Sequence, residues 1–132
     1  MASKTAFEHF EDIAARYEKT MGGLSQGLSR HIDRGPAVTI NTDSVVLDNA
    51  CSTAIVRGEI FRALPASDIL PTVHAVDINP AVVGSARSKP VIAAHADHIH
   101  FEVMLAEKLT FLGAIFTYSI TNIGIFFFTD AT

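Results

Sequence analysis

Two aspartates stand at the ends of apolar segments, and their positions give the first indication of chemistry. Asp48 closes the run SVVLD and precedes a turn of small residues at 50–54, and Asp77 closes the run TVHAVD. In a parallel sheet, the turn after the first strand brings backbone N–H groups close to a ligand, and an acid ending the second strand reaches a ribose. Alternatively, Asp48 accepts N–H bonds within its own turn, and Asp77 faces the N-terminus of the helix that follows it. The sequence leaves both interpretations open.

The elements that must position these acids alternate between strand and helix. Asn79 is predicted to cap a helix that has Pro80 at its first position. A turn around Gly113 is expected to separate the last two strands. Such alternation predicts parallel strands joined by right-handed crossovers. We expect strands at residues 44–50, 72–78, 98–105 and 116–128, and helices at 53–64 and from Asn79 onward.

The segment before the first strand has the pattern of amphipathic helices. Thr5 and Glu8 have the spacing of a capping box, and apolar residues follow at helical intervals until the glycine pair at 22–23. A second, shorter helix is expected after this pair. We predict that residues 1–35 form a helical lid or flank and that residues 36–132 form the main domain.

Composition excludes several classes of protein. The 132 residues are 48% hydrophobic, enough for the core of one globular domain, and the formal charge of −4 argues against a nucleic-acid surface. No apolar run reaches the roughly 18 residues of a membrane span, and the N-terminus has no signal-peptide core. The single cysteine, Cys51, excludes an intrachain disulfide framework. We expect a cytoplasmic protein with no membrane or nucleic-acid partner.

Four segments carry a resemblance to a known family. VLDNACSTAIV, AVDINPAVVGSAR, EVMLAEKLTF and SITNIGIFFFTD occur in an order and spacing that resemble class I S-adenosylmethionine-dependent methyltransferases, in particular the small-molecule methyltransferases of fungi. The resemblance implies an α/β, Rossmann-like methyltransferase fold with sheet order 3-2-1-4. It also implies that the chain stops after the fourth strand, where the family continues.

The resemblance assigns a cofactor site with substituted motifs. Glycines usual in the first turn are replaced by Ala50, Ser52 and Ala54, whose Cβ atoms stand where a cofactor needs close approach. Leu105 stands where the family places an acid that binds the adenine amine, and an unpaired buried donor costs about 1–3 kcal/mol. Glu107 is a candidate substitute for that acid. The ancestral cofactor-binding residues are Asp48, Ala50, Ser52, Asp77, Ile78 and Glu107.

Four residues are candidates for catalysis. Tyr17 and His31 lie in the segment that forms a lid over the substrate in the family, and the imidazole of histidine suits acid–base work near neutral pH. Tyr118 and Asn122 lie on the fourth strand, whose carboxyl end faces the family's active site. Alternatively, Tyr17 belongs to the apolar stripe of its helix, and the polar residues of the fourth strand satisfy one another in the core.

A histidine pattern and the cysteine have structural alternatives. His95, His98 and His100 suggest a metal site, with His98 and His100 predicted on one strand face, but no third ligand is evident and we expect no metal. Cys51 has no base beside it in sequence. We therefore interpret it as a small buried hydrophobe rather than a nucleophile.

The substituted motifs favour a repurposed enzyme. We expect a methyltransferase-like protein of secondary metabolism that carries out a cofactor-independent cyclisation or isomerisation in an apolar pocket. One alternative is an S-adenosylmethionine-dependent methyltransferase completed by dimerisation, and another is a non-catalytic partner of a full-length methyltransferase. The apolar run from Phe116 to Phe128 predicts a homodimer through the fourth strand.

Overall fold

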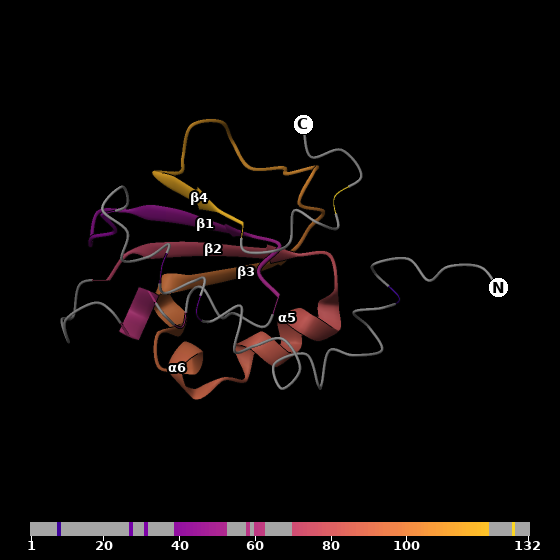
Figure 1. Ribbon diagram of the computed structural model, residues 1–132, viewed down its shortest axis with the longest axis horizontal. Helices are drawn as coiled ribbons and strands as arrows, with labels where there is room; N and C mark the ends of the chain where they lie inside the picture. Colours follow the sequence, from indigo (N-terminus) through magenta and orange to yellow (C-terminus); the bar gives the residue numbers. More distant parts are fainter. Residues whose placement is uncertain are drawn as a thin grey trace.

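The computed structural model contains a four-stranded parallel sheet in the order β3-β2-β1-β4. It describes Glu8, Gly27, His31, residues 39–52, Gly58, residues 60–62, residues 70–121 and Phe128. Figure 1 shows the four arrows pointing the same way, so that all carboxyl ends meet at one edge. The predicted order 3-2-1-4 is confirmed. The strands are β1 Val45–Asn49, β2 Thr72–Asp77, β3 Ile99–Val103 and β4 Tyr118–Ile120.

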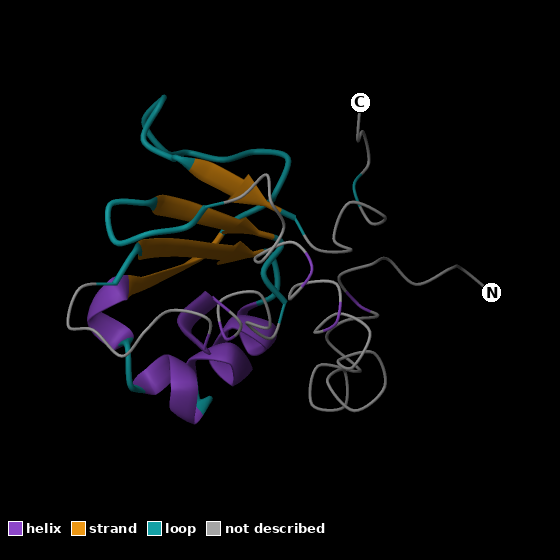
Figure 2. Ribbon diagram, turned by 60° about the vertical axis from the view of Figure 1, so that its left-hand side comes forward, coloured by secondary structure: helices purple, strands orange, loops and turns teal. Residues whose placement is uncertain are grey.

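The connection from β2 to β3 contains α5 (Pro80–Arg87), α6 (Pro90–Ala93) and the 3-10 turn η1 (Ala96–His98). The predicted start of α5 is confirmed, because Asn79 Oδ1 accepts hydrogen bonds from the N–H groups of Ala81 and Val82, at 2.9 and 3.3 Å. Figures 1 and 2 show α5 and α6 on the same side of the sheet, and α5 contacts β2 and β3.

The core lies between this helical layer and one face of the sheet. Val46, Val73 and Ile99 occupy the same register position on three adjacent strands, and all are buried. β-branched residues suit such a surface, and full burial of each contributes about 1.5–3 kcal/mol. Ile60 and Phe61, which are helical as predicted, complete this cluster with Ala86, Ile92 and Ile120.

The opposite face of the sheet carries a polar and aromatic cluster. Leu47, His74 and His100 share one register position there. Phe111 and Phe116, from the segment between β3 and β4, meet the His74 ring edge-on, with centroids at 5.4 and 5.6 Å. This segment therefore folds back over the sheet.

Several sequence-based boundaries differ from the structure. β4 begins at Tyr118 rather than Phe116, because the Phe116 ring packs against Phe111 at 5.0 Å and the Thr117 Oγ1 accepts a hydrogen bond from the Val45 N–H. Residues 122–127 lie outside the described part, so the dimer through this segment stays a prediction. His98 lies in η1 and not in β3, so the prediction that it shares a strand face with His100 is wrong.

The N-terminal segment is described only at Glu8, Gly27 and His31, all of which are helical. The division into residues 1–35 and 36–132 therefore stays a prediction. Within the described residues, no helix combines the length and the apolar character needed to cross a membrane.

Candidate functional site

Asp77 connects three elements at the carboxyl edge of the sheet. Its Oδ1 accepts a hydrogen bond from the Asn79 N–H at 3.0 Å, and its Oδ2 accepts one from the Ser52 N–H at 2.9 Å. Its backbone carbonyl accepts from the Met104 N–H at 3.0 Å, just beyond β3. These bonds fit the structural interpretation of Asp77, in which its carboxylate holds the turn after β1 and the start of α5 together. The ligand-binding interpretation stays a prediction.

The turn after β1 keeps a glycine-like backbone although it has side chains. Ala50 has φ 55° and Ser52 has φ 49°, both in the left-handed region. Each such residue costs about 1–2 kcal/mol relative to glycine, and such strain is concentrated at functional sites. The Cys51 N–H donates to the Val76 carbonyl at 2.8 Å, which fixes the turn against β2. The Cys51 side chain is buried, as predicted.

Asp48 lies within β1, two residues before Ala50 in this turn. It is only 1% exposed and lies in register with Ala75 on β2 and Ile120 on β4. Asp48 is therefore less accessible to a ligand than Asp77, which is half-buried.

Exposed apolar residues follow the carboxyl ends of β2 and β3, and Ile78 and Leu105 are called the apolar wall below. Ile78 and Leu105, which follow β2 and β3, are 44% and 42% exposed, and Val103 is also exposed. Exposed aliphatic groups beside a carboxylate form the mixed surface that small-molecule sites use. Glu107 is exposed in the adjoining turn. The Leu105 side chain has no hydrogen-bond acceptor, as expected from the sequence.

Buried polar atoms at the same edge are a feature that the sequence analysis missed. Asn49, the last residue of β1, donates from Nδ2 to the Ala106 carbonyl at 3.1 Å. In the described structure its Oδ1 is buried without a hydrogen-bond partner, as are Ser52 Oγ and Asn79 Nδ2. The available signal for Asn49 was a second polar residue, next to Asp48, at the end of a strand that begins with three apolar residues.

Of the remaining catalytic candidates, Tyr118 lies away from this edge. Tyr118 pairs with Val46 at the opposite end of the sheet, and its hydroxyl donates to the Thr39 carbonyl at 3.1 Å. His31 is exposed on a helical segment. Tyr17 and Asn122 lie outside the described residues.

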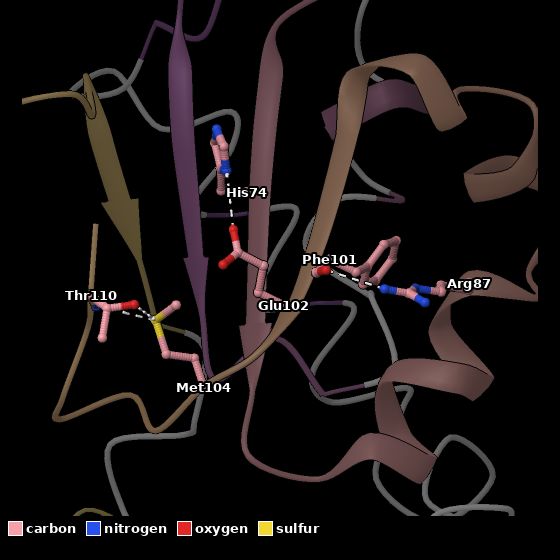
Figure 3. A network of polar contacts seen from close by, with 6 residues as sticks. All are labelled: His74, Arg87, Phe101, Glu102, Met104 and Thr110. Atoms are coloured by element: carbon pink, nitrogen blue, oxygen red, sulfur yellow. Dashed lines mark hydrogen bonds and ion pairs between the residues drawn. The ribbon is translucent and has the colours of Figure 1, made fainter. Parts of the chain in front are cut away.

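A second titratable cluster surrounds His74, and the sequence analysis missed it. His74 Nδ1 lies 4.0 Å from Glu102 Oε1, and the His74 and His100 ring centroids are 4.9 Å apart. Figure 3 shows the His74 ring and the Glu102 carboxylate pointing toward each other from β2 and β3. Burial, and secondarily His100, lower the pKa of His74 below 6.5, while Glu102 opposes this shift. The described residues contain no group of three or more histidine, cysteine or acidic side chains able to hold a metal.

The outer edge of β3 is covered by Arg87. Its Nη2 donates to the Phe101 carbonyl at 3.1 Å, and its guanidinium lies 5.4 Å from the Phe101 ring centroid (Figure 3). An open groove of about 630 Å³ runs beside these residues, lined also by Ile92 and Ile99. A cation on an edge strand discourages pairing with another strand. We assign this groove no part in the site around Asp77.

Comparison with known proteins gives structural matches only. No protein-family model and no curated protein matches the sequence. A putative S-adenosyl-L-methionine-dependent methyltransferase from Methanococcus maripaludis is 12% identical, with TM-score 0.71 over 98% of this chain. The plantazolicin methyltransferase BpumL, solved with S-adenosylhomocysteine, is 12% identical, with TM-score 0.60 over 92%. The cyclase SpnF is 14% identical, with TM-score 0.57 over 71%.

These matches extend over only part of each solved protein. The chain covers 57% of the Methanococcus protein, 44% of BpumL and 32% of SpnF. Strand order, parallel pairing, Asp48 near the end of β1 and Asp77 at the end of β2 nevertheless agree with one architecture. The described chain therefore has the Rossmann-like fold of the class I S-adenosylmethionine-dependent methyltransferases.

Proposed function

We propose that this chain is a methyltransferase-like small-molecule enzyme whose carboxyl sheet edge binds the adenosyl group of S-adenosylmethionine. The observation that carries the proposal is the Asp77 carboxylate, held by the Ser52 N–H from a turn in the left-handed conformation. This arrangement places an acid and the backbone of the first turn side by side. Ordered acceptors of this kind suit the two hydroxyls of a ribose.

The residues at this edge fit the parts of that ligand. Asp77 would accept hydrogen bonds from the ribose hydroxyls, Ile78 would contact a face of the adenine, and Leu105 would lie near the adenine edge that carries the amine. The turn at Ala50 and Ser52 would lie along the methionine portion. When bound, S-adenosylmethionine supplies an electrophilic methyl group. The chain's own contribution would be to hold and orient its ligands and to exclude water. Rate enhancement by proximity and orientation works in this way.

A second candidate is a cofactor-independent cyclisation or isomerisation on the same fold. The observation favouring it is Leu105, whose apolar side chain provides no acceptor for the adenine amine. The structural likeness to the cyclase SpnF supports it by analogy of fold alone. In this candidate, the apolar wall at Ile78 and Leu105 contacts the substrate itself.

The test is isothermal titration of the whole chain with S-adenosylhomocysteine and S-adenosylmethionine. We expect micromolar affinity that Asp77→Asn weakens by about 10-fold or more, because a hydrogen bond to a charged group contributes about 1.5–3 kcal/mol. Asp97→Asn is the matched control, since Asp97 is an exposed acid in η1. Absence of binding up to millimolar ligand would reject the proposal and make the second candidate the leading one.

A further inference from the structure

We propose that Asn49 is a positioning residue of the adenosyl site, because its side-chain amide tethers the Ala106 carbonyl and so holds Leu105 at the carboxyl edge. The inference rests on the proposed function for the identity of the ligand. It gives a residue of β1 a part in positioning Leu105, which follows β3.

The tether joins parts of the chain that are 57 residues apart. Asn49 ends β1 and is 8% exposed, and its Nδ2 donates to the Ala106 carbonyl at 3.1 Å. On the other side of Leu105, the Met104 N–H donates to the Asp77 carbonyl at 3.0 Å. Leu105 therefore lies between two hydrogen-bonded neighbours, one anchored to β1 and one to β2. Leu105, 42% exposed, is thus held through its two backbone neighbours.

Stability alone does not favour asparagine at this position. In the described structure Asn49 Oδ1 is buried without a hydrogen-bond partner, which destabilises the folded state. Leu47, on the same face of β1, is apolar and buried. A leucine at position 49 would avoid the cost of the unpaired oxygen but would lose the tether. A buried polar group that is retained at such a cost beside a binding edge is expected to serve position rather than stability.

Hydrogen–deuterium exchange of the whole chain tests the tether without any ligand. The reporter is the Lys108 amide, which donates to the Leu105 carbonyl at 2.9 Å within the tethered segment. We expect Asn49→Leu to speed its exchange by about 10-fold or more, since a lost hydrogen bond of about 1.5 kcal/mol corresponds to that factor. The Val83 amide in α5, bonded to the Asn79 carbonyl, should not change. Asn41→Leu, at an exposed asparagine before β1, is the control variant.

Binding and stability complete the test. We expect Asn49→Leu to keep or raise the melting temperature while weakening S-adenosylhomocysteine binding by about 10-fold. Asn49→Asp keeps the shape but replaces the donor with acceptors, so it should also release the segment even if the leucine variant fails to fold. Unchanged exchange at Lys108 in the folded variants would overturn the inference. If the wild type binds no S-adenosylhomocysteine, the proposed function fails, and the exchange result alone decides whether Asn49 positions this wall.

Discussion

The Ser52 backbone N–H donates to Asp77 Oδ2 at 2.9 Å, and this bond joins the turn after β1 to the end of β2. The same carboxylate accepts from the Asn79 N–H, so it organises both turns at the carboxyl edge. Removing the charge therefore affects the shape of the site as well as any ligand contact. Measurements of stability and of binding have to be made on the same variants.

Asp77→Asn is expected to lower the free energy of unfolding by about 1.5–3 kcal/mol. An amide can accept from only one of the two N–H groups, and its NH₂ would face the other donor. Urea denaturation followed by circular dichroism measures the change. Asp97→Asn, at an exposed acid, should stay within about 0.5 kcal/mol of the wild type. Equal stability of the two variants would contradict the central place of Asp77 in the fold.

Ala50→Gly and Ser52→Gly are expected to stabilise the protein, by about 0.5–1 kcal/mol each. Relief of the left-handed strain raises the free energy of unfolding by about 1–2 kcal/mol. The greater conformational freedom of glycine in the unfolded chain lowers it by about 0.4–1 kcal/mol. Ser52→Gly should give the larger gain, because it also removes the buried, unpaired Oγ.

The control for the glycine variants is Ala81→Gly, in the first turn of α5, which should destabilise the protein by about 0.5–1 kcal/mol. The opposite signs make the comparison informative in one set of urea titrations. If glycine at 50 and 52 destabilised the protein as it does at 81, the left-handed turn would not be present in solution.

Leu105→Asp is expected to tighten S-adenosylhomocysteine binding by about 10-fold, because a carboxylate would then be available to the adenine amine. The substitution is tolerable since the leucine is 42% exposed. Leu109→Asp, in the same segment and 38% exposed, introduces the same charge away from the apolar wall. Equal effects of the two variants in titration calorimetry would show that charge alone, and not an adenine contact, is responsible.

Much of the fold could be predicted because local patterns and tertiary structure agree. The alternation of strand and helix, the Asn79 cap and the acids at 48 and 77 all follow from local chemistry. The left-handed turn could not be read from Ala50 and Ser52, since neither residue favours that conformation. Other features depend on pairing between distant segments, which the spacing of residues along the chain does not encode. Examples are the hydrogen bond from Asn49 to the Ala106 carbonyl and the position of Tyr118 at the amino end of β4.

Stability is also expected to depend on the protonation of His74. Burial and then His100 lower the pKa of His74 in the folded state, whereas Glu102 acts in the opposite direction. Phe111 and Phe116, from the segment that folds over this face, present only aromatic rings to the imidazole. The unfolded chain therefore binds this proton more readily than the folded one. The free energy of unfolding should fall as pH decreases from about 6.5 to the folded-state pKa, and His74 contributes no further change below it.

His74→Leu should remove this part of the pH dependence, while the apolar side chain still packs against the neighbouring rings. The measurement is urea denaturation at half-unit steps between pH 7.5 and 5. Each unit of difference between the folded and unfolded pKa of His74 changes the free energy of unfolding by about 1.4 kcal/mol over this range. His98→Gln is the matched control, because His98 lies in η1, outside this cluster. A His74→Leu profile parallel to that of the wild type would mean that the imidazole titrates alike in the folded and unfolded chain, and that the aromatic cluster does not exclude water from it.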